Sequence, residues 1–319
     1  MTDAEARAWL LEPDNPSARY LALTGLLDRP ADDAEVKAAQ EAIPTWGPAR
    51  AILEAQWPQG YWVRPGVGYS PRHKATVWQV IFLAALGAPP VEAVQRACAY
   101  VLDHSRLSDG RFSASRLSQG ARACLSGALL RALLQFGYSD PRLEESIEAL
   151  ARIGMRDAWR CRVLGEAGHA GQSCAWGAIK ALGAFAELAE GQRSPAVREA
   201  IESGVSLLQA GDLATGEGLI SCEPGPEWLQ FGFPLGISSD LLEALEVMAR
   251  LAGGAHQQPV SALQVVLGKR NRDGRWILEW TPSNSWADFG RVGQPNKWVT
   301  FRALQVLKIW KAECFQGRR

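Results

Sequence analysis

Three cysteines and one histidine are the side chains of this sequence best suited to bind a soft metal ion. Cys161, His169 and Cys174 lie in one Gly-rich stretch, and Cys124 stands near the start of an earlier apolar segment. Thiolate and imidazole groups are ligands that zinc prefers in proteins. The pattern predicts a zinc site at these four residues, and zinc is the only cofactor it suggests. Buried cysteine, which is common in helical cores, is the alternative.

Aromatic side chains are the second feature that could serve binding or catalysis, because the chain contains 13 Trp residues. Aromatic faces stabilise cations and shape a cavity for an apolar chain. The candidates stand near the starts of apolar segments or in the loops between them: Trp78, Trp176, Trp228, Phe233, Trp286 and Trp298. We predict that they line an interior cavity, and ordinary aromatic packing is the competing interpretation.

A small basic cluster precedes one apolar segment. His73 lies between Arg72 and Lys74, directly before Ala75. With the help of helix N–H groups, such a cluster can hold a diphosphate or carboxylate head group. A solvated loop is the alternative interpretation of the same residues.

Five apolar segments must position these side chains: Ala75–Leu86, Ala121–Phe136, Cys174–Leu188, Ser238–Leu251 and Lys297–Trp310. Each is apolar around most of its circumference, which predicts a helix buried on nearly all sides. Four more segments carry a narrower apolar stripe and predict outer helices: Val91–His104, Pro141–Ile153, Pro195–Gln209 and Pro259–Leu267. Residues 15–27 and 34–56 predict a further helix pair, which an acidic segment at residues 4–11 precedes.

Alternation of buried and outer helices is typical of repeat architectures. Five or six such pairs can close into a ring with the apolar helices inside. We therefore predict an all-α protein, an α/α toroid that occupies residues 1–319 as a single domain. Residues 1–60 would supply the first helix pair and an N-terminal strap. An open superhelix is the competing geometry.

A turn signature recurs between the helix pairs. Residues 56–62 read Gln-Trp-Pro-Gln-Gly-Tyr-Trp, residues 273–276 repeat Gly-x-Trp after Asp, and residues 109–112 give a copy that ends in Phe. A residue pair such as Asp-Gly makes a tight turn, and the following aromatic ring can fold back on the helix end. These rings are predicted to act as staples.

The spacing of this signature resembles the Gln-x-x-x-Gly-x-Trp repeat of squalene–hopene and oxidosqualene cyclases. It is also similar to the turns of protein prenyltransferase β subunits. The resemblance covers residues 50–312 and implies the α/α toroid of these enzymes. A likeness to bacterial proteins with prenyltransferase/squalene-oxidase repeats rests on residues 124–127, 233–235, 240–245, 273–276 and 297–300.

The resemblance also implies a catalytic acid. Class II terpenoid cyclases protonate an alkene or epoxide with an Asp of an Asp-x-Asp-Asp motif, whereas residues 238–240 of this chain read Ser-Ser-Asp. Asp240, or Asp288 in the long loop 279–296, would be the acid. The alternative is that Ser238 or Ser239 caps the following helix and Asp240 interacts favourably with the positive end of that helix. The zinc site of prenyltransferases does not carry over, because Leu242 stands where that family has Cys.

Composition restricts the partners. The 34 basic and 34 acidic residues cancel, which disfavours nucleic acid. The acidic N-terminal residues and the lack of a long apolar run favour a cytoplasmic protein without a transmembrane segment. We predict a terpenoid cyclase-like or prenyltransferase-like protein that binds, and as an enzyme would cyclise, an isoprenoid or similar apolar chain. A non-catalytic binding toroid and a zinc-binding toroid are the alternatives.

Overall fold

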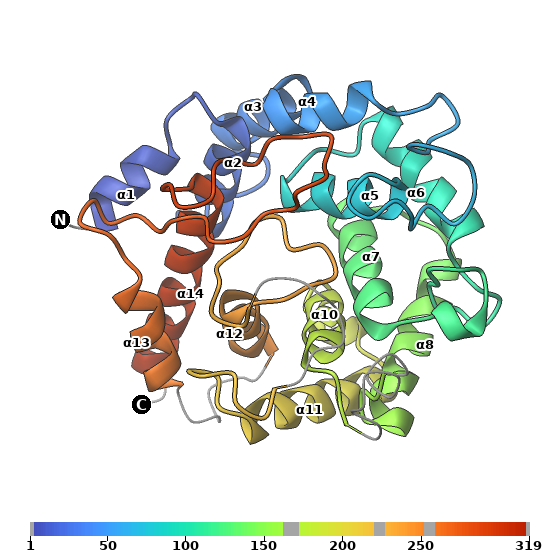
Figure 1. Ribbon diagram of the computed structural model, residues 1–319. Coiled ribbons are helices and arrows are strands. Elements are labelled where there is room, and N and C mark those ends of the chain that lie inside the picture. Colours follow the sequence, from blue (N-terminus) through green and yellow to red (C-terminus); the bar gives the residue numbers. More distant parts are fainter. Residues whose placement is uncertain (1–2, 162–171, 220–226, 252–258, 317–319) are drawn as a thin grey trace.

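Helices dominate the described chain, which comprises residues 3–161, 172–219, 227–251 and 259–316 of a computed structural model. Six described helices surround the centre of the molecule (Figure 1): α2 (Pro16–Gly25), α5 (Thr76–Ala85), α7 (Ala123–Gln135), α10 (Ala175–Phe185), α12 (Leu241–Leu251) and α14 (Lys297–Gln316). The outer layer contains α1 (Asp3–Leu10), α3 (Ala34–Ala42), α4 (Gly47–Glu54), α6 (Glu92–His104), α8 (Arg142–Asp157), α11 (Pro195–Ala210) and α13 (Val260–Gly268). Among the described residues there is no strand, only isolated bridges.

The inner helices form a closed ring. Helix α7 packs against α5 and α10, α12 packs against α10 and α14, and α14 packs against α2. Between α2 and α5, the Ser17 hydroxyl donates a hydrogen bond of 2.7 Å to the carbonyl of Leu86. The closed ring with its outer layer confirms the predicted all-α, α/α toroid and excludes the open superhelix.

Outer helices cover the ring from outside. Four inner helices contact the outer helix that follows them in the chain. The pairs are α2 with α3, α5 with α6, α7 with α8, and α10 with α11. The inner helix α14 instead contacts α1. Lys297, the first residue of α14, ion-pairs with Glu12 and Asp14 just beyond α1. The N-terminal segment is therefore the outer partner of the last inner helix.

The turn signature repeats in its hydrogen bonds as well as in its sequence. The indole Nε1 of Trp62 donates to the carbonyl of Ile52 at 2.7 Å, and the Trp62 backbone N–H donates to Thr76 Oγ1 at 3.1 Å. Trp276 makes the same two bonds, to the Val266 carbonyl at 2.7 Å and to Thr300 Oγ1 at 3.0 Å.

The Phe copy keeps the backbone bond. The N–H of Phe112 donates to Ser126 Oγ at 3.0 Å, and Trp62, Phe112 and Trp276 are all fully buried. Each turn therefore binds a hydroxyl near the start of an inner helix through a backbone N–H group, and in the two Trp copies the ring also binds the preceding outer helix, α4 or α13. This confirms the predicted staple role.

Loop lengths differ between the two ends of the ring. The chain enters α5, α7, α10, α12 and α14 through long loops, and it leaves α2, α5, α7 and α10 through shorter connections. The inner helices consequently run in the same direction, with their N-terminal ends at the rim that carries the long loops. No helix in the described part of the chain combines the length and apolar character needed to cross a membrane.

Candidate functional site: the central cavity

A cavity of about 760 Å3 lies inside the ring. Residues 233–236 close it at the rim of long loops, where Phe233 and Leu235 are buried. At the opposite rim the lining includes the exposed residues Asp28, Gln135 and Arg250, so the cavity opens to solvent there. The space exists because small residues face it from the inner helices: Gly25, Ala84, Ala85, Ala128 and Ala132.

One wall of the cavity is apolar. It is formed by α2, α5, α14 and the loop before α12, through Leu21, Ile81, Phe233, Leu235, Phe301 and Ile309. Phe301 and Phe233 are the aromatic residues among the described lining residues. An apolar ligand can bind against this wall, because the contact removes water from the apolar surfaces of the wall and of the ligand.

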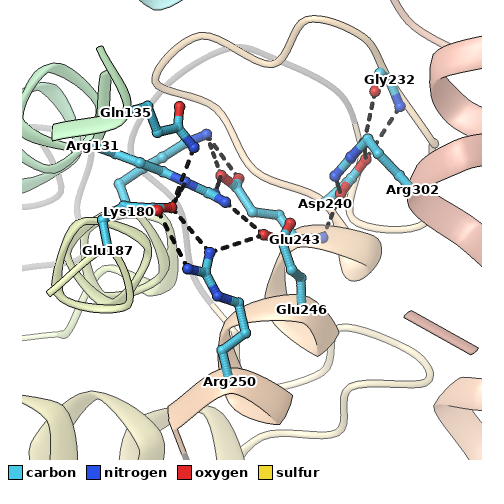
Figure 2. Close-up of polar contacts among 10 residues, drawn as sticks. All are labelled: Arg131, Gln135, Lys180, Glu187, Gly232, Asp240, Glu243, Glu246, Arg250 and Arg302. Carbon is cyan, nitrogen blue, oxygen red and sulfur yellow. Dashed lines mark hydrogen bonds and ion pairs between the residues drawn. The ribbon is translucent and has the colours of Figure 1, made fainter. Parts of the chain in front are cut away.

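The facing wall carries ion pairs and is built by α7, α10 and α12 (Figure 2). Arg131 lies among three carboxylates, with its Nε 3.1 Å from Glu187, Nη2 2.5 Å from Glu246 and Nη1 3.5 Å from Glu243. Arg250 also pairs with Glu187, at 3.0 Å. We call these residues, together with Lys180, the ionic wall.

Electrostatic interactions within the ionic wall outweigh burial. Burial alone would raise the pKa of Glu246, but Arg131 and Arg250 hold that pKa at about 2. Burial alone would lower the pKa of Arg131, but the three neighbouring carboxylates raise it above its ordinary value. The carboxylate of Glu246 is therefore ionised at neutral pH.

Lys180 is the deepest cation of the ionic wall. Its Nζ lies 2.8 Å from Oε1 and 2.7 Å from Oε2 of Glu243, and only 5% and 7% of these two side chains are exposed. Burial lowers the pKa of Lys180; Glu243 opposes that shift, and the positive charges of Arg131 and Arg302 add to it. The Lys180–Glu243 pair is thus a buried ion pair whose ammonium group is destabilised by its surroundings.

Charges around the cavity balance. The lining contains five basic residues, Arg131, Lys180, Arg250, Arg302 and Lys308, and four acidic residues, Asp28, Glu187, Glu243 and Glu246. Asp240 adds a fifth acid directly behind Arg302, with which it pairs at 2.6 Å. Counted together with Asp240, the described charges around the cavity therefore leave no surplus positive charge for an anionic ligand.

Asp240 lies behind the cavity wall and not in its lining. The side chain is fully buried, and Arg302 contacts its two oxygens at 2.6 and 2.8 Å. The backbone N–H groups of Gly232 and Glu243 also donate to it (Figure 2). This set of donors ties the loop before α12 to α14. The bond from Glu243 N–H makes Asp240 the residue that caps α12, in place of the predicted Ser238 or Ser239, whose buried hydroxyls have no hydrogen-bond partner among the described residues. The catalytic role of Asp240 stays a prediction.

Asp288 is an exposed loop residue. Its Oδ1 accepts a hydrogen bond of 2.8 Å from the N–H of Gly290, and it does not line the cavity. The geometry therefore brings neither predicted acid to the cavity surface.

Of the six aromatic candidates, Phe233 is the one among the lining residues. Trp298 stacks on Phe233 with ring centroids 4.8 Å apart, and its Nε1 donates to Ser17 Oγ at 2.9 Å. Trp78 is fully buried, and its Nε1 donates to the Tyr69 carbonyl at 2.7 Å. Trp298 and Trp78 support the cavity from behind.

The other three Trp candidates lie elsewhere. Trp176 is buried in a small cluster with Cys161 and Cys174. Trp228 Nε1 donates to the Leu213 carbonyl, and the exposed Trp286 donates to the Lys74 carbonyl. Their part in ligand binding stays a prediction that the lining of the cavity does not support.

His73 is buried at the rim of long loops, outside the cavity lining. Burial, assisted by the charge of Arg72, lowers its pKa from 6.5 to about 4. Arg72 Nε donates to His73 Nε2 at 3.2 Å, and the imidazole ring meets Trp78 edge-on. A neutral, packed histidine is poorly suited to hold an anionic head group, so the predicted role of His73 gains no support here.

The cysteines are split between two clusters. Cys124 belongs to the main core, whereas Cys161 and Cys174 pack together beside Trp176. Cys174 Sγ accepts the N–H of Gly177 at 3.4 Å and so caps α10. His169 lies outside the described residues, and within them no group of three or more His, Cys, Asp or Glu is placed to hold a metal ion. The zinc site stays a prediction.

The ionic wall is the part of the site that the sequence predictions missed. The sequence held a signal for it, since Arg131 and Lys180 are charged residues inside otherwise apolar segments. A charged residue that cannot reach solvent from an inner helix must be paired within the ring.

No protein-family model matches the chain, and no curated protein matches it either. A solved structure with similarity is an alanine variant of the type II terpene cyclase MstE from Scytonema, in complex with its product merosterolic acid A. The two chains are 10% identical, with 95% of this chain and 98% of the cyclase chain covered and a TM-score of 0.31. At that score the likeness carries no argument about activity, and the fold assignment depends on the helix contacts described above.

Proposed function

We propose that the central cavity binds a neutral isoprenoid, or a similar apolar molecule with an uncharged polar group. The observation that carries this proposal is the pairing of an apolar wall with an ionic wall of balanced charge. The cavity volume of about 760 Å3 is suitable for a ligand of fifteen or more carbon atoms, since small-molecule sites span roughly 300–1,000 Å3.

The charge balance favours a neutral ligand over a prenyl diphosphate. A diphosphate needs unpaired cations or a metal ion to offset its charge inside a protein. Here Arg131, Lys180 and Arg250 each face a carboxylate already. Hydroxyl, aldehyde or ketone groups, by contrast, can exchange hydrogen bonds with the ionic wall without adding charge.

Binding without cyclisation is the activity that the described residues support best. Protonation of an alkene needs a carboxylic acid that is neutral and faces the ligand. The acids that line the cavity are Asp28, Glu187, Glu243 and Glu246, and all four are held in ion pairs. Asp240, behind the lining, is bonded to Arg302. This favours the predicted alternative of a binding toroid over a terpenoid cyclase.

Thermal unfolding with matched ligands tests the proposal. Farnesol and squalene should raise the unfolding temperature, because a ligand present at 100 times its Kd stabilises the folded state by about 2.7 kcal/mol. Farnesyl diphosphate should stabilise less than farnesol. The variant Ala85→Trp, which fills the cavity, should lose the response. Greater stabilisation by the diphosphate, or an undiminished response of the filled variant, would contradict the proposal, and product formation would restore the cyclase alternative.

A further inference from the structure

Two described lysines line the cavity, and they differ in depth. Lys308 lies at the open rim, where its Nζ contacts Asp28 and the carbonyl of Gly25. Lys180 lies in the interior, with 4% of the residue exposed, and points toward Glu243 (Figure 2). A primary amine that lies inside an apolar cavity next to a carboxylate has the two groups that condensation with a carbonyl compound requires.

We propose that Lys180 forms an imine with an aldehyde or ketone ligand in the cavity, with Glu243 as the proton carrier. The inference rests on the proposed function, since it assumes that an apolar ligand enters the cavity. It narrows the ligand class from neutral isoprenoids in general to those that carry a carbonyl group.

The step balances in atoms and charge. Glu243 accepts a proton from the Lys180 ammonium group over 2.7–2.8 Å, and the free amine attacks the carbonyl carbon. Glu243 returns that proton to the carbonyl oxygen, a second proton passes from the attacking nitrogen to the same oxygen by way of Glu243, and the oxygen leaves as water while the C=N bond forms. The product is a protonated imine plus water, so the lysine nitrogen keeps its positive charge and Glu243 ends as a carboxylate. The ion pair of the wall is therefore preserved.

The surroundings of Lys180 favour this reaction. Burial and the neighbouring cations Arg131 and Arg302 lower the pKa of Lys180, which makes release of its proton easier than from an exposed lysine. Ala128 and Leu235 lie in the same lining and keep part of the cavity apolar. A ligand that fills the cavity would exclude water from the imine and so disfavour its hydrolysis.

Reductive trapping tests the proposal. The full-length protein is incubated with farnesal and sodium cyanoborohydride, and the mass of the intact chain and of its peptides is measured. We expect one adduct per chain, of farnesal less its oxygen atom, in the peptide that contains Lys180. Farnesol, which occupies the cavity without reacting, should protect Lys180 from labelling.

Variants separate the imine from simple proximity. Lys180→Arg keeps a cation beside Glu243 but cannot condense, so the adduct should be lost; the unfolding temperature of this variant without ligand shows whether it folds. Glu243→Gln should slow labelling at a fixed pH. Lys37→Arg, at an exposed lysine, should change nothing.

The outcomes distinguish the two proposals. If farnesol stabilises the protein but Lys180 remains unlabelled, or if labelling is spread over exposed lysines without protection by farnesol, the imine proposal is wrong and ligand binding stands. If neither farnesol nor farnesal stabilises the protein, both proposals fall.

Discussion

Arg131 shows at the scale of one residue how strongly the ionic wall depends on complete pairing. Its guanidinium group contacts Glu187, Glu243 and Glu246, and 17% of its side chain is exposed. A buried ion pair contributes little net stability, but a buried charge left without its partner is costly. Loss of Arg131 should therefore be costly, because it would leave buried carboxylates without this cation.

Replacing Arg131 with Met should destabilise the protein by about 3–5 kcal/mol, because three carboxylates would share the remaining cations. Urea unfolding at pH 7 measures the change. Arg50→Met is the matched control, since Arg50 and Glu54 form an exposed pair whose loss should change stability much less. Equal effects of the two substitutions would show that the wall is solvated and not buried.

His73 should make stability depend on pH below neutrality. Its folded-state pKa, about 4, is depressed from the ordinary value of 6.5, so the unfolded chain binds more protons between these values. The stabilising contribution is complete above pH 6.5 and is lost as pH falls toward 4. Wild type should accordingly lose stability relative to His73→Asn over this range; Asn tolerates the left-handed backbone, with φ 64°.

Urea unfolding of both proteins at pH 7.5, 6.5, 5.5 and 4.5, a series chosen to bracket this window, measures the difference. The gap in unfolding free energy should change little between the two higher values and most steeply below pH 6.5. A gap that is independent of pH would mean that His73 titrates normally.

At the scale of the element, the glycine of the repeated turn allows the loop to pass close to an outer helix. Gly60 has φ 91°, and a Cβ at this position would lie 2.6 Å from the carbonyl oxygen of Arg96 on α6. Gly137 also has a positive φ, 61°, but a Cβ there would meet no atom within 4 Å. The two glycines therefore share the backbone requirement and differ in the close approach.

Gly60→Ala should consequently be more destabilising than Gly137→Ala. In both variants alanine must adopt a left-handed backbone, which costs about 1 kcal/mol. In Gly60→Ala the new methyl group also forces α6 away from the turn, at a further cost of about 1–3 kcal/mol. Chemical unfolding of the two variants gives the comparison. Similar losses would indicate that α6 yields without strain.

Helices and turns were predictable from the sequence because both have local causes. The predicted segment Val91–His104 differs from α6, Glu92–His104, by one residue. A continuous apolar stripe defines this helix, and the prolines directly before Val91 mark its start. Residues 34–56 were predicted as one helix, but Pro44 and Gly47 divide it into α3 and α4. Proline within a helix removes a backbone hydrogen bond, so the interruption follows from chemistry that the apolar pattern alone does not register.

At the scale of the whole molecule, ring closure links distant parts of the chain. Leu10 of α1 is fully buried, and Lys297 of α14 pairs with Glu12 and Asp14. The guanidinium group of Arg275 lies 4.1 Å from the centre of the Trp9 ring. A destabilising substitution in α1 should therefore also destabilise α14, at the other end of the chain.

Leu10→Ala should destabilise the protein by about 2–5 kcal/mol and speed amide hydrogen exchange in α14. Leu27→Ala, at a residue that is 38% exposed, should do neither. Hydrogen exchange followed by mass spectrometry measures both. Faster exchange confined to α1 would show that this helix is an appendage and not part of the ring.

The cavity lining was hard to predict, because it depends on which faces of six helices meet. The aromatic pattern pointed to Trp78 and Trp298, which support the cavity from behind, whereas Phe301 was missed. An inner helix has apolar residues on all sides, so periodicity does not identify its inward face. The isolated charges Arg131 and Lys180 mark that face better, since they need partners across the ring.

The common direction of the inner helices has an electrostatic consequence. The peptide dipoles of each helix leave a partial negative charge at its C-terminal end. Here several such ends surround one opening, and the basic residues Arg250 and Lys308 lie beside it. Lys308 donates to the carbonyl of Gly25 and Arg250 to that of Ala186, so cations cap two of these helix ends. The entrance therefore offsets its backbone dipoles with side-chain charge.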